Sequence, residues 1–236
     1  MKSKGIFIIG IDTAVGKTTI AAGLCTLLLR KGMNVGVMKP FASGSTKYSR
    51  RFKSLDSKIL KDASGCKDTD DLINPYYSTL PTAPYLANKI LRLNENIEKQ
   101  EILSKYKNIE RRHEFTIVEG IGGLMVPLNG NFFVADLASL INLPTILIMS
   151  NRIGSLNHII MTYRLSLEFN LKIAGIIINN KCKVLETYCK LITNSLPHAV
   201  EELTQSRVLA TIPYIKKPTA KKIADILEKY NFIKNL

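Results

Sequence analysis

Six short runs of apolar residues recur along the chain, and most of them are continuous rather than alternating. A strand with one face in water alternates apolar and polar residues, whereas a strand that is covered on both faces is apolar throughout. The runs therefore predict the strands of a mostly parallel sheet that lies beneath helices. The predicted strands are Ile6–Ile9, Val35–Met38, Phe115–Val118, Thr145–Met149, Ala174–Ile178 and Val208–Ile212.

Between these runs, apolar residues recur at the spacing of amphipathic helices. The predicted inner faces are Ile20, Leu24, Leu27 and Leu28 within Lys17–Arg30, then Leu156, Ile159, Ile160, Tyr163 and Leu167, and last Ile223, Ile226, Leu227 and Tyr230. Alternating strands and helices predict an α/β fold, a doubly wound sheet with helices on both faces, in one domain over residues 1–236. Such folds bind ligands beyond the carboxyl ends of their strands.

The region 44–112 has the weakest pattern. Thr46–Lys53 is polar and basic, which predicts a mobile loop. Pro75, Pro81 and Pro84 break up the stretch that follows.

A glycine loop with a lysine and a threonine follows the first predicted strand. Gly10–Thr18 reads Gly-Ile-Asp-Thr-Ala-Val-Gly-Lys-Thr, which is a P-loop with five residues between its glycines where the common motif has four. The side chain of Lys17 is expected to bind phosphate oxygens and the hydroxyl of Thr18 to bind Mg²⁺. The phosphates would rest on backbone N–H groups at the helix start. Those groups belong to Ala14, Val15, Gly16, Lys17, Thr18 and Thr19.

Charged residues close two other predicted strands. Lys39 follows Val35–Met38 and suits a second anion beside the first, although an ordinary strand-exit loop is the alternative. Glu119 ends the strand that begins at Phe115, and an acid in this place in a P-loop protein usually serves Mg²⁺. Gly120 and Gly122 would let the backbone approach a ligand. Asp56 is either a second carboxylate for the metal or a helix-capping residue.

Two further segments leave alternatives open. Gly154 opens a predicted helix whose free N–H groups suit a carboxylate, but Asn157 and His158 equally suit capping or packing. Asn179 ends a strand, where its amide suits an adenine edge or an ordinary turn.

The charge and composition exclude several classes of protein. The formal net charge is +14, from 33 Lys and Arg against 19 Asp and Glu, but the basic groups are spread out and lack interleaved aromatic residues. We therefore expect no nucleic acid partner. The longest apolar runs are too short to span a bilayer, which predicts no membrane partner and a cytoplasmic protein. The four cysteines show no metal-ligand spacing and are expected to be small buried residues.

Taken together, the motifs resemble those of the dethiobiotin synthetase family, the ATP-dependent carboxylase-ligases of biotin synthesis. The similarity covers residues 5 to about 215, and the long P-loop and Lys39-Pro40-x-Ala42-Ser43-Gly44 are its specific parts. Supporting segments are Asn74-Pro75-Tyr76, Pro81-Thr82-Ala83-Pro84, Val118-Glu119-Gly120-x-Gly122-Gly123, Gly154-x-x-Asn157-His158 and Ile212-Pro213. The family often has an acid where this chain has Ala14.

The resemblance implies that 7,8-diaminononanoate, CO₂ or bicarbonate, and ATP with Mg²⁺ react to form dethiobiotin. It implies catalytic roles for Lys17 and Lys39, and a metal site of Thr18, Asp56 and Glu119. The diamine would contact Thr13 and Ser43. The substrate carboxylate would lie near Gly154, Asn157 and Tyr188 at the interface of a homodimer. The adenine pocket would be lined by Asn179, Asn180, Pro213, Tyr214 and Ile215.

Two other kinds of P-loop protein are considered. Amidating synthases of corrin side chains carry a glutamine-hydrolysing domain, for which this chain has neither room nor a Cys-His pair. The ATPase switches that position proteins on membranes or segregate DNA usually have a second lysine early in the loop. This chain has no lysine between Gly10 and Gly16, so that class remains only the alternative.

Overall fold

The centre of the protein is a six-stranded sheet in which every pairing is parallel. The computed structural model describes residues 5–44, 48–49, 52–92, 97–181 and 187–232, without the side chains of 187–189. The strand order is β10-β9-β8-β1-β5-β2. The strands are β1 (Gly5–Gly10), β2 (Val35–Met38), β5 (Phe115–Glu119), β8 (Thr145–Ser150), β9 (Ile173–Asn179) and β10 (Val208–Ile212). All six predicted strands are confirmed, with ends that shift by one residue at most.

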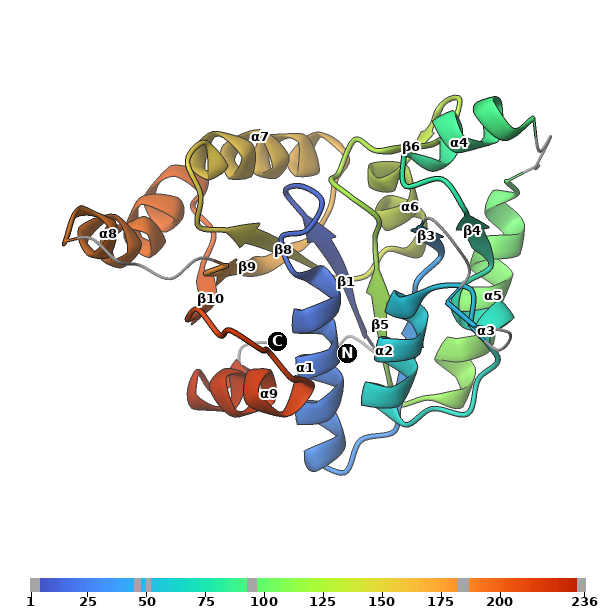
Figure 1. The fold of residues 1–236 in the computed structure, drawn as a ribbon, viewed down its shortest axis with the longest axis horizontal. Coiled ribbons are helices and arrows are strands. Elements are labelled where there is room, and N and C mark those ends of the chain that lie inside the picture. The colour runs from blue at the N-terminus through green and yellow to red at the C-terminus, as the bar shows by residue number, and fades with distance from the viewer. Residues whose placement is uncertain (1–4, 45–47, 50–51, 93–96, 182–186, 233–236) are drawn as a thin grey trace.

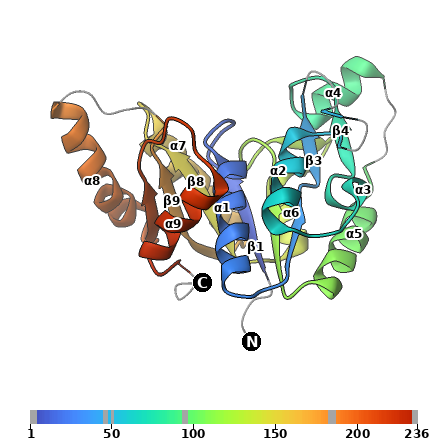
Figure 2. The same cartoon turned by 60° about the horizontal axis from the view of Figure 1, so that its bottom comes forward.

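Helices cover both faces of the sheet (Figures 1 and 2). One face carries α1 (Lys17–Arg30), α2 (Leu55–Ser64) and α9 (Ala220–Lys229). The other face carries α5 (Lys99–Arg112), α6 (Val134–Ile141), α7 (Ser155–Glu168) and α8 (Thr187–Thr204). The doubly wound α/β fold is therefore confirmed. No helix among the described residues is long and apolar enough to cross a bilayer.

Helix α1 lies between α2 and α9 and begins directly at the P-loop (Figure 1). The predicted inner face of α1 is buried. Gly23, which has no side chain, allows α9 to pack close to α1. A Cβ atom on Gly23 would lie 2.2 Å from Cγ2 of Ile223, so a side chain there would push the two helices apart. The packing of α9 thus fixes the helix that presents the phosphate-binding loop.

Two residues predicted to face inward are exposed instead. Leu167 is half exposed, whereas the buried residues of α7 are Ser155, Ile159, Thr162 and Ser166. In the second half of the helix the buried stripe thus follows Thr162 and Ser166 and leaves Leu167 beside it. Tyr230 follows the end of α9, and its hydroxyl donates to the carbonyl of Thr211, 3.2 Å away, which keeps the ring near the surface.

The region 44–112 contains several elements that its sequence did not predict, including the longer helices α2 and α5. The short ones are α3 (Asp70–Ile73), α4 (Pro84–Leu91) and β4 (Tyr76–Ser78), which pairs in parallel with β3 (Phe41–Ser43). A further small hairpin joins β6 (Pro127–Asn129) and β7 (Phe132–Phe133). Much of the predicted mobile loop Thr46–Lys53 lies outside the described residues, namely 46–47 and 50–51.

Candidate active site

The P-loop connects the end of β1 to the start of α1 and contains two left-handed residues. Ala14 has φ 57° and Gly16 has φ 99°. Gly16 caps α1 without a capping side chain, so the N–H groups of the first turn are available to a ligand. This is the arrangement that favours a bound phosphate at a helix N-terminus.

Asn179 holds the P-loop from the neighbouring side of the sheet. Its Nδ2 donates to the carbonyl of Val15 at 2.8 Å. A Cβ atom on Gly16 would lie 2.2 Å from the same nitrogen. Only a glycine at this position therefore lets the loop approach Asn179 so closely. The amide nitrogen that was expected to face adenine is thus engaged with the loop.

Lys17 is buried and bridges two glycine-rich loops. Its Nζ donates to the carbonyls of Asp12 and Gly122, at 2.9 and 2.8 Å. Burial lowers the pKa of Lys17 to about 8, assisted by the nearby Lys39 ammonium and opposed by the Glu119 carboxyl. An anion that approaches this amine would therefore stabilise its charged form and raise its pKa.

Lys39 and Glu119 form a buried ion pair at the carboxyl ends of β2 and β5. The Nζ of Lys39 lies 2.5 Å from Oε1 of Glu119, 3.0 Å from the carbonyl of Gly120 and 3.3 Å from Oδ2 of Asp56. The hydroxyl of Thr18 donates to the same Glu119 oxygen at 2.8 Å. The structure therefore brings together the lysine, the two carboxylates and the P-loop hydroxyl that the sequence singled out.

The charges of this cluster depend on one another. Burial alone would lower the pKa of Lys39, but the Glu119 and Asp56 carboxylates more than offset it, so its pKa is raised. Burial raises the pKa of the Glu119 carboxyl, and the Lys39 ammonium only partly counteracts this effect. Lys39 thus stays cationic, and Glu119 needs a cation beside it to remain an anion.

Glu119 has an oxygen that suits a metal ion. Its Oε2 is buried and has no hydrogen-bond partner among the described residues, although its Oε1 has two. A carboxylate, a second carboxylate at Asp56 and the hydroxyl of Thr18 are hard oxygen donors, which Mg²⁺ prefers. The described part of the chain has no group of three or more His, Cys, Asp or Glu side chains placed to bind a metal. A metal here would therefore draw on nucleotide phosphates for its other ligands.

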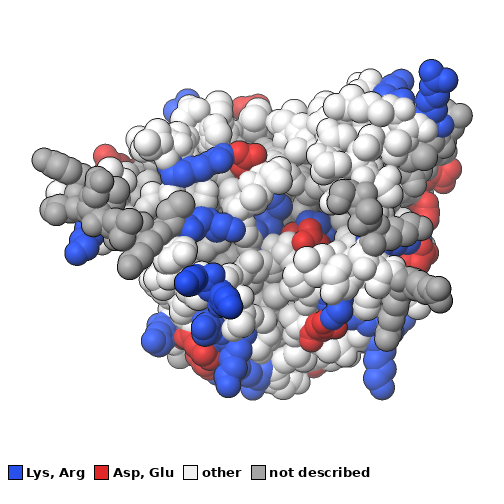
Figure 3. Space-filling view, viewed as in Figure 1, with Lys and Arg blue, Asp and Glu red and all other residues white. Residues whose placement is uncertain are grey.

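A cavity of about 360 Å³ joins these groups. Its size is within the range of small-molecule sites. The cavity is lined by Thr13, Ala14, Gly16, Lys17, Thr18, Thr19, Lys39, Ala42, Ser43, Asp56, Ile59, Glu119, Ile121, Gly122 and Lys181. In Figure 3 acidic and basic groups meet in the hollow at the centre of the view.

A second cavity, of about 250 Å³, continues from the first along Thr19 and Lys181. Its lining includes the predicted base-side residues Asn179, Asn180, Pro213, Tyr214 and Ile215. The Oδ1 of Asn180 is buried and without a partner among the described residues. The walls of this cavity are partly apolar and partly polar, whereas the first cavity holds the buried charged groups.

The start of α7 approaches the P-loop from the other side. Gly154, with φ 86°, is the N-cap of α7, and Arg152 just before it forms an ion pair with Asp12 of the loop. Asn157 is exposed on the first turn of α7. Tyr188 belongs to α8, but its side chain lies outside the described residues.

Three residues near the site were not singled out by sequence reasoning. Arg152 pairs with the P-loop, and Lys181 lines both cavities. Asn74 is fully buried, and its Nδ2 donates to the carbonyl of Lys39 at 2.8 Å. The Asn74-Pro75 pair was visible as a motif, but nothing in its pattern indicated a contact with Lys39.

Comparison with known proteins identifies the relatives of this chain. The family described as AAA domain matches residues 4–222. The ATP-dependent dethiobiotin synthetase of Nitrosopumilus maritimus is 37% identical over 233 residues, which cover 99% of both chains. The enzyme of the same name from Bacillus subtilis is 34% identical and covers 96% of this chain and 94% of its own.

Solved structures agree on the fold at much lower identity. A ParA family ATPase from Chlorobium tepidum has a TM-score of 0.57 at 15% identity, covering 96% of this chain and 98% of its own. The MinD cell division protein of Aquifex aeolicus has a TM-score of 0.58 at 14% identity, with 96% of each chain covered. These structures support the P-loop fold alone, whereas the sequence relatives identify the family. The chain belongs to the family of ATP-dependent dethiobiotin synthetases.

Proposed function

We propose that this protein uses ATP to close the cyclic urea of dethiobiotin from 7,8-diaminononanoate and CO₂. One amine takes up CO₂ as a carbamate, the γ-phosphate of ATP activates the carbamate as a mixed anhydride, and the second amine attacks and releases phosphate. The observation that carries the proposal is the Lys39 ammonium beside Glu119 and Asp56 at the phosphate end of the P-loop cavity. We propose that the protein is cytoplasmic. We propose that residues 1–236 form a single domain.

Lys17 and Lys39 are the proposed catalytic residues. Carbamate and γ-phosphate are both anions, and bringing them together is costly unless cations surround them. Lys17 faces the cavity from the P-loop and Lys39 from the end of β2, so that negative charge develops between two ammonium groups. Preorganised charges of this kind supply a large part of the catalysis in phosphoryl transfer.

Mg²⁺ is the proposed cofactor, held by Thr18, Asp56 and Glu119 together with the phosphates of ATP. It would neutralise phosphate charge and fix the orientation of the transferred group. The Oε2 of Glu119, which has no hydrogen-bond partner in the part of the chain that the structure describes, supports this assignment. Residues Ala14 to Thr19, with Gly120 and Gly122, would hold the phosphates, and Asn179, Asn180 and residues 213–215 the base.

The diamine is proposed to lie between the P-loop at Thr13 and the segment after Lys39 at Ser43, next to the γ-phosphate. Thr13 and Ser43 line the same cavity as Lys39, which supports a role for their hydroxyls in orienting the amines. The distant carboxylate would reach the start of α7 near Gly154 and Asn157, with Tyr188 as a further contact.

We propose that two copies of the chain assemble, with the diamine site at their interface. Some of the exposed apolar side chains support this proposal, because they lie on α4, on α7 or next to them in the chain. Among them are Leu86, Ile90, Ile153 and Met161. Both helices lie along the upper edge in Figure 1. Sedimentation at assay concentration is expected to give a dimer, and a monomer alone would contradict the shared site.

The test of the function is the dependence of ADP formation on the substrates. Purified protein with ATP and Mg²⁺ is expected to form ADP only when diaminononanoate and bicarbonate are both present, with dethiobiotin as the product by mass spectrometry. Omitting either substrate serves as the control. ATP hydrolysis that is independent of both, and that DNA or liposomes stimulate, would instead support an ATPase switch.

Nucleotide binding is expected to take up a proton above neutral pH. Burial lowers the pKa of Lys17 to about 8 in the free protein, and phosphate beside the amine raises it again. At about pH 6.5 Lys17 is charged before and after binding, so little proton uptake is expected. At about pH 9 the free amine is mostly neutral and the bound one charged, so uptake approaches one proton.

Calorimetry of ADP binding in two buffers with different ionisation enthalpies measures this uptake. Lys17→Arg is the control, because a guanidinium stays charged throughout this pH range. The uptake should vanish in that variant. An uptake that is equal at both pH values in the unmodified protein would contradict the role of Lys17.

A further inference from the structure

Asp56 needs a fixed position to serve a metal, yet its helix begins at the surface. Asp56 is the second residue of α2, and its side chain is 41% exposed. Leu55 and Ile59 on the same end of α2 are exposed as well. Apolar burial therefore contributes little to the placement of this first turn, and polar contacts have to hold it.

A single carboxylate holds both sides of that turn. Oδ2 of Asp70 accepts the backbone N–H of Lys53 at 2.8 Å, and Oδ1 accepts the hydroxyl of Ser57 at 2.6 Å. Lys53 precedes the N-cap Ser54, and Ser57 follows Asp56 by one residue. Asp56 thus lies between two positions that are bonded to the same side chain on α3.

Helix α3 is in turn fixed to the backbone of Lys39. The N–H of Lys39 donates to the carbonyl of Ile73 at 2.8 Å, and Asn74 donates to the carbonyl of Lys39 at 2.8 Å and to that of Tyr76 at 3.1 Å. Since Asp56 also pairs with the side chain of Lys39, the contacts close a ring. The ring runs from Lys39 through α3, Asp70 and α2 to Asp56 and back.

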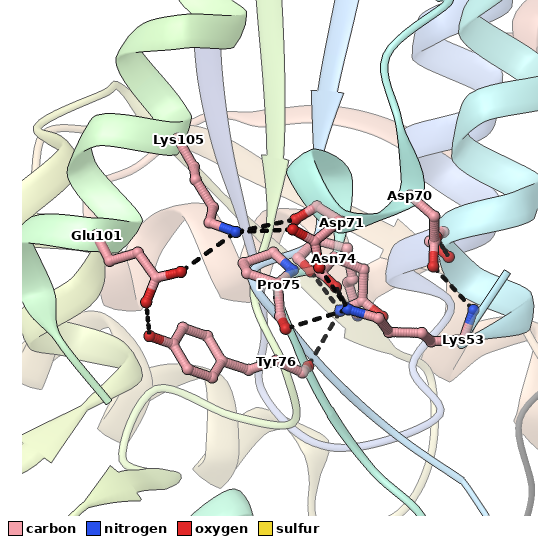
Figure 4. Close-up of polar contacts among 10 residues, drawn as sticks. Lys53, Asp70, Asp71, Asn74, Pro75, Tyr76, Glu101 and Lys105 are labelled. Atoms are coloured by element: carbon pink, nitrogen blue, oxygen red, sulfur yellow. Dashed lines mark hydrogen bonds and ion pairs between the residues drawn. The ribbon is translucent and has the colours of Figure 1, made fainter. Parts of the chain in front are cut away.

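Figure 4 shows how Asp70 differs from its neighbour Asp71. Asp71 is 69% exposed and pairs with the side chains of Lys53 and Lys105, at 2.8 and 3.1 Å. These are surface ion pairs, which contribute little to stability. Asp70 bonds instead to the backbone N–H of Lys53, so only Asp70 constrains the path of the chain into α2.

We propose that Asp70 is a positioning residue, which sets the distance of Asp56 from Lys39 and thereby completes the metal side of the site. Asp70 touches neither nucleotide nor metal in this role. The inference rests on the proposed function of Asp56 as a metal ligand. Partners behind a metal ligand typically change metal affinity about 10- to 100-fold when they are replaced.

The test compares Asp70→Asn with Asp71→Asn in the full chain, by calorimetry of ADP binding with Mg²⁺ and with EDTA. The amide that replaces the Asp70 carboxylate can accept only one of the two hydrogen bonds, so we expect Mg²⁺·ADP to bind about tenfold more weakly. Binding in EDTA should change by less than about twofold, because the phosphate loop is untouched. Asp71→Asn should leave both affinities within about twofold.

Two further variants make the outcomes separable. Ser57→Ala removes the hydroxyl that contacts Asp70 and the carbonyl of Ser54 in its own turn. It should weaken Mg²⁺·ADP binding in the same direction by about threefold, even if Asp70→Asn unfolds. Asp56→Asn tests the metal ligand itself.

The three variants together distinguish the possible outcomes. If Asp56→Asn weakens Mg²⁺-dependent binding and Asp70→Asn and Ser57→Ala do not, the positioning role is wrong. If Asp56→Asn has no effect, the proposed metal site is wrong. Equal losses with Mg²⁺ and with EDTA would show general damage and overturn the inference.

Discussion

Lys39→Gln is expected to lower kcat by at least about 10³-fold while Mg²⁺·ADP still binds. Removing one preorganised donor at a developing anion costs about 10² to 10³ in rate, and here a full charge is lost as well. The amine of Lys39 lies at the buried end of the cavity, where little water can replace it. Nucleotide binding should survive, because the P-loop amides and Lys17 remain in place.

Steady-state kinetics and calorimetry separate these two effects. Lys58→Gln is the matched control, since it makes the same change in a partly exposed lysine on α2 that pairs with Asp62. The control should retain kcat within about twofold. Unchanged turnover in Lys39→Gln would exclude Lys39 from the reacting centre. A loss of nucleotide binding as large as the loss of turnover would show that the lysine serves binding rather than chemistry.

The sheet could be predicted because its strands are apolar on both faces. The same reasoning placed polar residues at the strand ends, and Lys39 and Glu119 do meet there, on the adjacent strands β2 and β5. Strand order itself was not required for this prediction. It sufficed that the carboxyl ends of parallel strands share one edge of the sheet.

The short elements that pack beside the helix of Asp56 could not be predicted, since tertiary contacts stabilise them. Strands β3 and β4 have three residues each and α3 has four. Elements of this length have no readable periodicity. A buried amide at Asn74 and a carboxylate at Asp70 hold them, and neither contact leaves a pattern in the local sequence.

Asn179 shows a second limit of sequence reasoning. Its position at the end of a strand suited an adenine contact or an ordinary turn equally, and the structure places its amide nitrogen on the carbonyl of Val15. A side chain at the correct edge of a sheet can serve the protein's own loop as well as a ligand. Only coordinates distinguish the two, because both require the same residue at the same place.

Glu119→Gln is expected to destabilise the free protein by about 3 kcal/mol, in addition to abolishing turnover. Breaking a buried ion pair from one side leaves a charge without its main partner, here the ammonium of Lys39, which is 3% exposed. Its remaining partners are the half-exposed carboxylate of Asp56 and the carbonyl of Gly120. For a chain of this size the midpoint of thermal unfolding should fall by about 6–12 °C. Glu101→Gln is the control, because Glu101 is half exposed and lies on the surface of α5, so its loss should cost less than about 1 kcal/mol.

The double variant Lys39→Met with Glu119→Gln separates stability from catalysis. Removing both charges leaves nothing uncompensated, so most of the lost stability should return, although turnover stays absent. Lys39→Met alone should cost less than Glu119→Gln, because burial already raises the pKa of the Glu119 carboxyl and lets it neutralise. Denaturant unfolding of the four proteins measures the coupling. A double variant no more stable than Glu119→Gln would mean that Glu119 supports the fold through Thr18 rather than through Lys39. Recovery without activity would mean that the buried pair is kept for the reaction and not for the fold.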